Sequence, residues 1–196
     1  MFEVEIKFAV PDPESFLALL KEEFGLVFGE EIFESDLFFQ HPNRDFAQSD
    51  ECLRIRRHKE QILLTYKGPK IDSSSKTREE IELSLGDPDL PPEKRLERSR
   101  ELLNRLDFCE KAHLEKYRRS GVLNYQNRRI AITLDRIPEL GFFTEMELEV
   151  EFREEVEEAR SILFGLASDF RLENGIRTSY LELFLAKKRE IESIKM

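Results

Sequence analysis

Charged side chains recur at every second position in several segments of this sequence, and their types are those that bind cations or phosphate. In a β-strand, alternate residues face the same side, so each such run would place its charges on one face. A single strand of this kind is usually a half-solvated part of a sheet. At least five segments repeat the pattern, which predicts strands whose charged faces meet around a common interior. The charges are Glu3, Glu5 and Lys7; Arg54 and Arg56; Lys67; Arg78, Glu80 and Glu82; Asp135; and Glu145 and Glu147.

The acidic members of this set predict a metal site. Carboxylates two residues apart on a strand lie about 7 Å apart. At an effective dielectric constant of about 20, two such charges repel each other by roughly 2.4 kcal/mol. A cation removes this repulsion, and a site built only from carboxylate oxygens suits Mg²⁺ or Mn²⁺ rather than zinc. The predicted metal ligands are Glu3, Glu5, Asp135, Glu145 and Glu147.

The basic members predict an anion site on another wall of the same interior. Planar guanidinium groups match phosphate oxygens with paired hydrogen bonds, and lysines add compact positive charge. Acidic residues on one wall and basic residues on another suit a polyphosphate that carries a metal ion. The predicted phosphate ligands are Arg54, Arg56, Lys67, Arg78, Lys116 and Arg118.

Composition places the chain among soluble proteins. Its 196 residues carry a net charge of −10, and 40% of them are apolar, enough for a packed core in one expected domain over residues 1–196. We find no apolar run near the ~18 residues that cross a bilayer and no basic export signal at the start. Two cysteines fit a reducing cytoplasm. The acidic net charge argues against a nucleic-acid partner, so we expect a cytoplasmic protein that binds neither membranes nor nucleic acids.

Alternation of apolar and polar residues predicts the strands that position these charges. The polar segment 41–50 is instead typical of a turn. The predicted strands cover 2–8, 26–39 (as one or two strands), 53–58, 61–67, 76–85, 108–122, 128–137 and 142–152.

Helical spacing predicts four helices between these strands or after them. They cover 12–24, the segment from the proline-rich turn at 87–92 to about 106, 156–166, and a segment that begins at a capping box of Ser179 and Glu182. Strands joined by turns or single helices favour an antiparallel α+β fold. If the helices cover the apolar strand faces from outside, the sheet closes into an eight-stranded barrel with a charged lumen.

Seven short motifs, in order along nearly the whole chain, resemble those of one known family. They are EVEIK at 3–7, LRIR at 53–56, TYKGP at 65–69, REEIE at 78–82, KYR at 116–118, LD at 134–135 and GFFTEME at 141–147. This set is similar to that of CYTH domains, the superfamily named for the CyaB adenylyl cyclase and thiamine triphosphatase and also called triphosphate tunnel metalloenzymes. One motif alone would be weak support, but seven in the family's order identify the chain as a member.

The resemblance implies an eight-stranded antiparallel tunnel that binds a triphosphate together with one or two divalent cations. Lys7 and Lys67 are then both substrate ligands and catalytic residues, and the other basic residues named above bind phosphate. Supporting acids of the tunnel are expected at Glu80, Glu82 and Glu149. The segment 41–47, before the LRIR motif, resembles the class IV adenylyl cyclase branch more than the thiamine triphosphatases.

Three functions stay open on this sequence. A cyclase would convert ATP to cyclic AMP and pyrophosphate, whereas a triphosphatase would hydrolyse tripolyphosphate or an organic triphosphate with the same residues. A non-catalytic module would bind nucleotide or polyphosphate and would tolerate loss of the acids. Some thiamine triphosphatases are thought to activate water with a Lys-Tyr pair, but the strand expected to carry that tyrosine has Phe38 and Phe39. We favour the cyclase, and a homodimer is an open alternative for its assembly.

Overall fold

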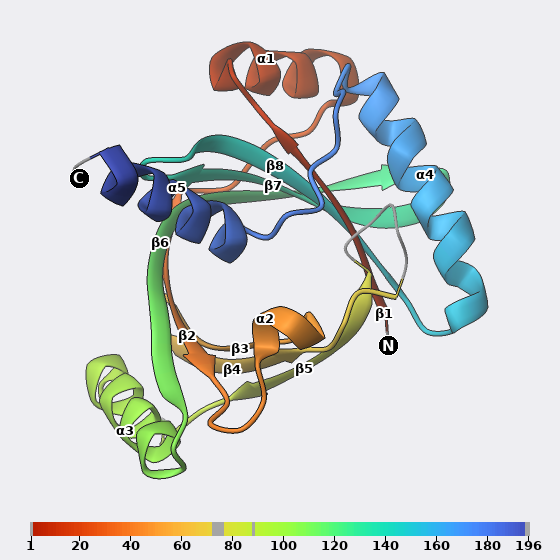
Figure 1. Cartoon of the computed structure of the whole chain (residues 1–196). Helices are drawn as coiled ribbons and strands as arrows, with labels where there is room; N and C mark the ends of the chain where they lie inside the picture. Colours follow the sequence, from red (N-terminus) through yellow and green to blue (C-terminus); the bar gives the residue numbers. More distant parts are fainter. Residues whose placement is uncertain (1, 72–76, 88, 195–196) are drawn as a thin grey trace.

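The computed structural model describes residues 2–71, 77–87 and 89–194, and in this part of the chain eight antiparallel strands form a closed barrel (Figure 1). The strand order around the barrel is β1-β5-β4-β3-β2-β6-β7-β8. The predicted α+β barrel is therefore confirmed. The strands are β1 (Phe2–Ala9), β2 (Ile32–Gln40), β3 (Cys52–His58), β4 (Gln61–Lys67), β5 (Arg78–Ser84), β6 (Cys109–Tyr125), β7 (Arg128–Ile137) and β8 (Gly141–Val150).

Alternation along β1 decides what the barrel encloses. Glu5 lines the interior, whereas its neighbours Val4 and Ile6 face outward and belong to the largest group of buried apolar residues. The same group includes Leu163 and Leu166 from a helix packed on the outside of the barrel. The hydrophobic core therefore lies between the barrel wall and the helices, and the lumen is left to the charged faces of the strands.

Helices cover much of the outer wall, as the apolar pattern predicted. None of the helices in the described part of the chain is long and apolar enough to cross a membrane. The helices are α1 (Pro13–Phe24), α2 (Phe46–Ser49), α3 (Pro92–Arg105), α4 (Val156–Asp169) and α5 (Tyr180–Ile194), with a 3₁₀ turn η1 (Arg153–Glu155) before α4.

The first helix illustrates how local sequence sets these elements. The Asp12 carboxylate accepts a hydrogen bond from the Ser15 backbone N–H at 3.1 Å, and Pro13 occupies the first helical position. Gly25 ends the helix in the left-handed conformation, with φ of 64°, which a residue without a side chain adopts at little cost. The ring of Phe170, at the C-terminal end of α4, packs edge-on against the ring of Phe24 in α1. The two ring centres are 4.8 Å apart, and this contact links the two helices.

Two sequence predictions are corrected between α1 and β3. The strand predicted over 26–39 begins only at Ile32, because the preceding residues leave the barrel wall and Gly29 makes a single backbone bond, to Ser120 O at 2.9 Å. The polar turn predicted over 41–50 contains the short helix α2. Its N-cap is Asp45, whose carboxylate accepts a hydrogen bond from the Ala47 N–H at 3.0 Å.

The helical covering is incomplete at β5. Ile81 and Leu83 face outward from this strand but are 50% and 54% exposed. The barrel closes here between β1 and β5, where the described residues form the pairs Phe2 with Glu79 and Glu3 with Arg78. The predicted start of this strand at residue 76 lies outside the described residues.

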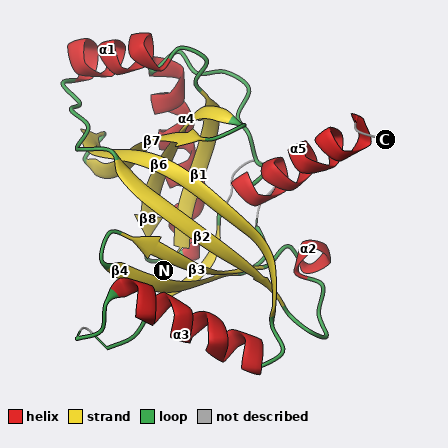
Figure 2. Ribbon diagram, turned by 90° about the vertical axis from the view of Figure 1, so that its left-hand side faces the viewer, coloured by secondary structure: helices red, strands yellow, loops and turns green. Residues whose placement is uncertain are grey.

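Two helices flank one opening of the barrel. In the view down the barrel, α2 and α5 lie on opposite sides of the opening (Figure 1), and the view turned by 90° places both at the same end (Figure 2). The base of α5 is held against β8 by an edge-on contact between the rings of Tyr180 and Phe143 at 5.4 Å. These two helices therefore frame the way into the lumen.

Candidate active site

The barrel encloses a cavity of about 1120 Å³ that continues to the α2 and α5 side of the opening. Among the predicted site residues, Lys7 and Asp135 do not line this cavity, and both are almost completely buried behind its wall. The others contribute to its lining: Glu3, Glu5, Arg54, Arg56, Lys67, Arg78, Glu80, Glu82, Lys116, Arg118, Glu145, Glu147 and Glu149. The charged faces of the strands therefore meet in one interior, as the repeated alternation predicted.

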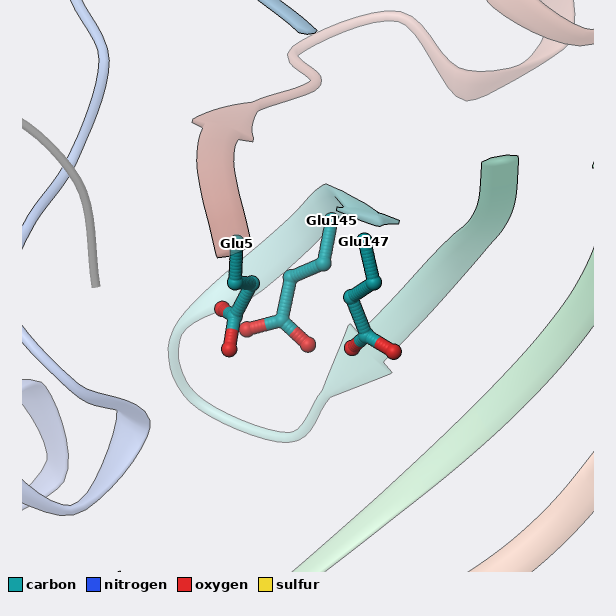
Figure 3. A group of neighbouring side chains, drawn as sticks. All are labelled: Glu5, Glu145 and Glu147. Carbon is teal, nitrogen blue, oxygen red and sulfur yellow. The ribbon is translucent and has the colours of Figure 1, made fainter. Parts of the chain in front are cut away.

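Three predicted metal ligands form one group. Glu5 on β1 and Glu145 and Glu147 on β8 each offer a carboxylate oxygen, and these oxygens lie within 4.8 Å of one another (Figure 3). The register explains this, because Glu5 stands directly opposite Glu147 in the β1–β8 pair. Three carboxylates at this spacing fit a divalent cation that prefers oxygen ligands.

Without a cation, this group is electrostatically unfavourable. Burial, followed by the charges of Glu3 and Glu5, raises the pKa of Glu147 to about 8. One carboxyl of the group therefore keeps its proton at neutral pH unless a positive charge replaces it. A cation that displaced this proton would be bound by three charged carboxylates.

The structure places the two other predicted metal ligands outside this group of three. The Glu3 carboxylate accepts a hydrogen bond from Lys67 Nζ at 2.9 Å, and Lys67 also pairs with Glu80 at 2.6 Å. Asp135 on β7 is fully buried and binds both Nε and Nη2 of Arg118, at 2.6 and 2.5 Å. Such a bidentate pair orients the guanidinium group, so the geometry of Asp135 suits a support for the basic wall.

Acids that the sequence interpretation did not select hold the arginines of β3. Asp36 on β2 is buried and accepts two hydrogen bonds from Arg56, both at 2.7 Å, while Arg54 lies 3.6 Å from the same carboxylate. Burial works to raise the pKa of Asp36, but Arg56 and Arg54 outweigh it and hold that pKa at about 2. Asp36 therefore stays charged and fixes both guanidinium groups at the cavity wall.

Glu34 performs the same task for the neighbouring strands. Its carboxylate lies 3.1 Å from Lys116 Nζ on β6, 3.3 Å from Arg56 and 2.8 Å from His58 on β3. Burial opposes ionisation, but Lys116 and Arg56 together hold the pKa of Glu34 well below its ordinary value. The sequence did contain a signal that could have identified both residues. Glu34 and Asp36 alternate along a strand that lies between two basic strands.

Comparison with known proteins now identifies the family. Residues 1–180 match the family model described as the CYTH domain. The chain belongs to the CYTH family. The membership predicted from the seven motifs is confirmed, and the closed antiparallel barrel is consistent with the triphosphate tunnel of this family.

Relatives of this CYTH chain extend over nearly its whole length. A protein of Methanocaldococcus jannaschii named as a candidate adenylate cyclase is 37% identical over 187 residues, which cover 93% of this chain and 98% of the relative. The solved structure of the PH1819 protein from Pyrococcus horikoshii is 36% identical, has a TM-score of 0.81 and aligns over 94% of this chain and 99% of that one.

A more distant solved structure shares the fold alone. It comes from a Hippeastrum protein titled as a candidate adenylyl cyclase that reveals a dominant triphosphatase activity. That structure is 18% identical, has a TM-score of 0.59 and covers 94% of this chain and 95% of its own chain.

Lys7, the lysine of the EVEIK strand of this CYTH chain, is 1% exposed and does not reach the cavity surface directly. Its Nζ donates a hydrogen bond to Thr178 O at 2.5 Å and lies 4.0 Å from the centre of the Tyr180 ring. Sequence interpretation missed Tyr180, because only the capping box of Ser179 and Glu182, which lie on either side of it, indicated the start of α5. The tunnel thus has a tyrosine beside a lysine, on an element other than the strand that carries Phe38.

Tyr180 is not suited to accept a proton. Burial, followed by the nearby charges of Glu145 and Asp135, raises the pKa of its hydroxyl well above the ordinary value. The phenol therefore stays protonated at neutral pH. A Lys-Tyr pair that activates water by deprotonating this residue is not supported here.

The remaining predicted residues lie on β5 and β8. Arg78 is buried, with Asp50 from the end of α2 at 3.9 Å, and Glu82 is exposed but accepts a hydrogen bond from Thr65 Oγ1 at 3.0 Å. Glu149 lines the cavity at an exposed position of β8. The structure therefore gives Arg78 a buried position on the basic wall and leaves the other two acids nearer the rim.

Proposed function

We propose that this chain is a metal-dependent enzyme that converts ATP to cyclic AMP and pyrophosphate. The observation that carries the proposal is the single cavity that holds three grouped carboxylates and, on other strands, a wall of oriented arginines and lysines. A triphosphate bound to a divalent cation needs both features at once. A non-catalytic binding module would have less need for the carboxylates, and here Glu5, Glu145 and Glu147 are all present and grouped.

The basic residues would bind the phosphate oxygens. Arg56 and Arg118 are each oriented by a buried carboxylate, so their remaining N–H groups are directed before a ligand arrives. In the cyclisation, the ribose 3′-oxygen forms a bond to the α-phosphorus, its proton is released, and the bond from this phosphorus to pyrophosphate breaks. Positive charge along the wall would stabilise the negative charge that pyrophosphate gains as it leaves.

The grouped carboxylates would hold Mg²⁺ or Mn²⁺. When bound, such an ion offsets negative charge on the phosphate oxygens and helps to orient them. Glu5, Glu145 and Glu147 fit this task because hard divalent cations prefer oxygen ligands.

The shape of the cavity supports an organic triphosphate as the substrate. Its volume of about 1120 Å³ slightly exceeds the roughly 300–1,000 Å³ that is usual for small-molecule sites. Beyond the charged wall, the lining continues with apolar side chains from β2, α2, β3 and α5, namely Phe39, Phe46, Leu53, Leu181 and Leu185. Inorganic tripolyphosphate would leave this apolar part unused, whereas a nucleoside would fill it.

Hydrolysis of a triphosphate is the second candidate. The same wall and the same carboxylates would serve an attack by water on the terminal phosphorus. The bond from this phosphorus to the bridging oxygen breaks, the diphosphate leaves, and the terminal phosphate is released as orthophosphate. The Hippeastrum protein titled for a dominant triphosphatase activity shares the fold, so this barrel is compatible with that reaction.

Product analysis separates the two reactions. We would incubate the protein with ATP and, separately, with tripolyphosphate, each with Mg²⁺ or Mn²⁺, and resolve the products by chromatography. Cyclic AMP with pyrophosphate is the expected result, and orthophosphate without cyclic nucleotide would favour the second candidate.

The Glu5→Gln variant should lose the activity, while Glu151→Gln, at an exposed position, serves as the matched control. Full activity in the Glu5→Gln variant would refute the metal site, and tight binding without any product would favour a sensor.

A further inference from the structure

We propose that Tyr180 is a positioning residue, whose aromatic ring holds the ammonium group of Lys116 in place at the phosphate-binding wall and that of Lys7 directly behind it. The inference rests on the proposed function, because both lysines are predicted ligands of the same triphosphate. It adds a residue from α5, outside the barrel strands, to the residues that determine how the substrate binds.

The ring lies close to both ammonium groups. Lys7 Nζ is 4.0 Å from the ring centre, and Lys116 Nζ is 5.6 Å from it. An ammonium group within about 6 Å of an aromatic ring is attracted to the negative face of the ring. Lys7 is 1% exposed, Lys116 2% and Tyr180 9%, so little water screens this attraction.

The backbone on either side fixes the ring relative to Lys7. The Ile176 N–H donates to Lys7 O at 2.7 Å, and Lys7 Nζ donates to Thr178 O at 2.5 Å. One residue further, Ser179 and Glu182 form the capping box at the start of α5, with hydrogen bonds of 2.7 and 3.2 Å. The segment that carries Tyr180 is therefore bound to β1 immediately before the helix begins.

A ring is suited to this position because it attracts a cation without neutralising it. Lys116 already lies 3.1 Å from Glu34 and 3.5 Å from Asp135, two carboxylates that it shares with Arg56 and Arg118. A further carboxylate at position 180 would compete with phosphate for the ammonium groups. The aromatic face leaves the net charge of the wall unchanged and restricts the two flexible side chains, so less ordering remains to be done when phosphate binds.

The test separates the ring from the hydroxyl and from the rest of α5. The variants are Tyr180→Leu, Tyr180→Phe and Phe184→Leu, and the last removes a half-buried ring of the same helix that does not line the cavity. The probe is inorganic tripolyphosphate, and its Kd is measured by calorimetry on the whole protein. We expect Tyr180→Leu to raise the Kd about tenfold, whereas Tyr180→Phe and Phe184→Leu stay near the wild type.

Several outcomes would overturn the inference. A wild-type Kd in Tyr180→Leu would show that the ring is not needed, and a Tyr180→Phe variant as weak as Tyr180→Leu would assign the effect to the hydroxyl. An equal loss in Phe184→Leu would assign it to the docking of α5. If Tyr180→Leu does not fold, as judged by circular dichroism, pentafluorophenylalanine at position 180 reverses the charge distribution of the ring within nearly the same shape. This variant should bind tripolyphosphate more weakly than Tyr180→Phe. Equal binding would refute the proposed role of the aromatic ring.

The wild-type titration separates this inference from the proposed function. A wild type that binds no tripolyphosphate refutes the triphosphate site itself, and the role of Tyr180 falls with it. A wild type that binds tripolyphosphate, together with an unchanged Tyr180→Leu variant, refutes only the role of Tyr180. Turnover gives a second readout, since loss of positioning at the phosphate wall should raise KM more than it lowers kcat.

Discussion

Replacing Glu147 by glutamine should change how the stability of this protein depends on pH. The carboxyl of Glu147 lies beside those of Glu5 and Glu145, and burial with the charges of Glu3 and Glu5 raises its pKa from 4.5 to about 8. In the unfolded chain the pKa returns to its ordinary value. Between these two values the folded protein still holds a proton that the unfolded chain has released, so its stability falls as pH rises through this window.

The size of the effect follows from the two pKa values. A change from 4.5 to about 8, at roughly 1.4 kcal/mol per pH unit, corresponds to a loss on the order of 5 kcal/mol once the carboxyl is charged. Glu147 is only half-buried, and solvent screening reduces this to about 2–3 kcal/mol. Glutamine has nearly the same shape but cannot ionise, so the Glu147→Gln variant should escape this loss.

Urea unfolding in the presence of a chelator provides the assay. At about pH 9, Glu147→Gln should be more stable than the wild type by about 2–3 kcal/mol, and at pH values near 4 the two should agree within about 0.5 kcal/mol. Excess Mg²⁺ should reduce the difference at high pH, because a bound cation replaces the proton. Glu151→Gln, at an exposed position directly after β8, should follow the wild type. If Glu147→Gln and the wild type lose equal stability between the two pH values, the raised pKa of Glu147 is wrong.

Three further substitutions test the wall and the outer core. Arg56→Ala should raise the Kd for tripolyphosphate about 10–100-fold in a calorimetric titration, because it removes charge-assisted hydrogen bonds; an unchanged Kd would remove Arg56 from the phosphate site. Asp135→Asn should weaken tripolyphosphate binding, because Arg118 loses its bidentate partner. Its affinity for Mn²⁺, measured by electron paramagnetic resonance, should fall less than that of Glu145→Gln, and an equal fall would make Asp135 a metal ligand. Phe170→Ala should lower the free energy of unfolding by about 3–5 kcal/mol in urea, since its buried ring joins α1 and α4; a loss below about 1 kcal/mol would contradict that packing.

The fold was largely predictable because alternation is a strong signal when one face is charged and the other apolar. On β1, the alternating charges at Glu3, Glu5 and Lys7 predicted both the strand and its charged and apolar faces. Repetition of this pattern in other segments predicted a barrel that encloses the charges. The start of β2 was not predictable, since Leu26 is apolar and buried although it lies outside the barrel wall. An apolar residue is expected both where helices bury it and where it belongs to a buried strand face. Residue type alone therefore does not show where β2 begins.

The candidate site was predictable in its residue types and less so in its pairings. Which carboxylates meet depends on the register between strands, and only the structure shows that Glu5 stands opposite Glu147 while Asp135 pairs with Arg118. No local pattern in the sequence pointed to Tyr180. Thr178, two residues before it, accepts a hydrogen bond from Lys7, and these two residues are 171 positions apart in the sequence. Such contacts depend on the path of the segment 176–179, which leads into α5 beside the opening, and no local pattern encodes that path.

The barrel separates stability from ligand binding on the two faces of each strand. Charges buried in pairs, such as Asp36 with Arg56, add little net stability, because desolvation offsets much of their attraction. The apolar residues between the barrel and the helices, with Ile6 and Leu163 among them, must therefore supply most of the free energy of folding. The lumen is then able to keep a density of charge that would be costly in a conventional core. Substitutions in the lumen should act mainly on ligand affinity and pH response, and substitutions on the outer faces should act mainly on the free energy of unfolding.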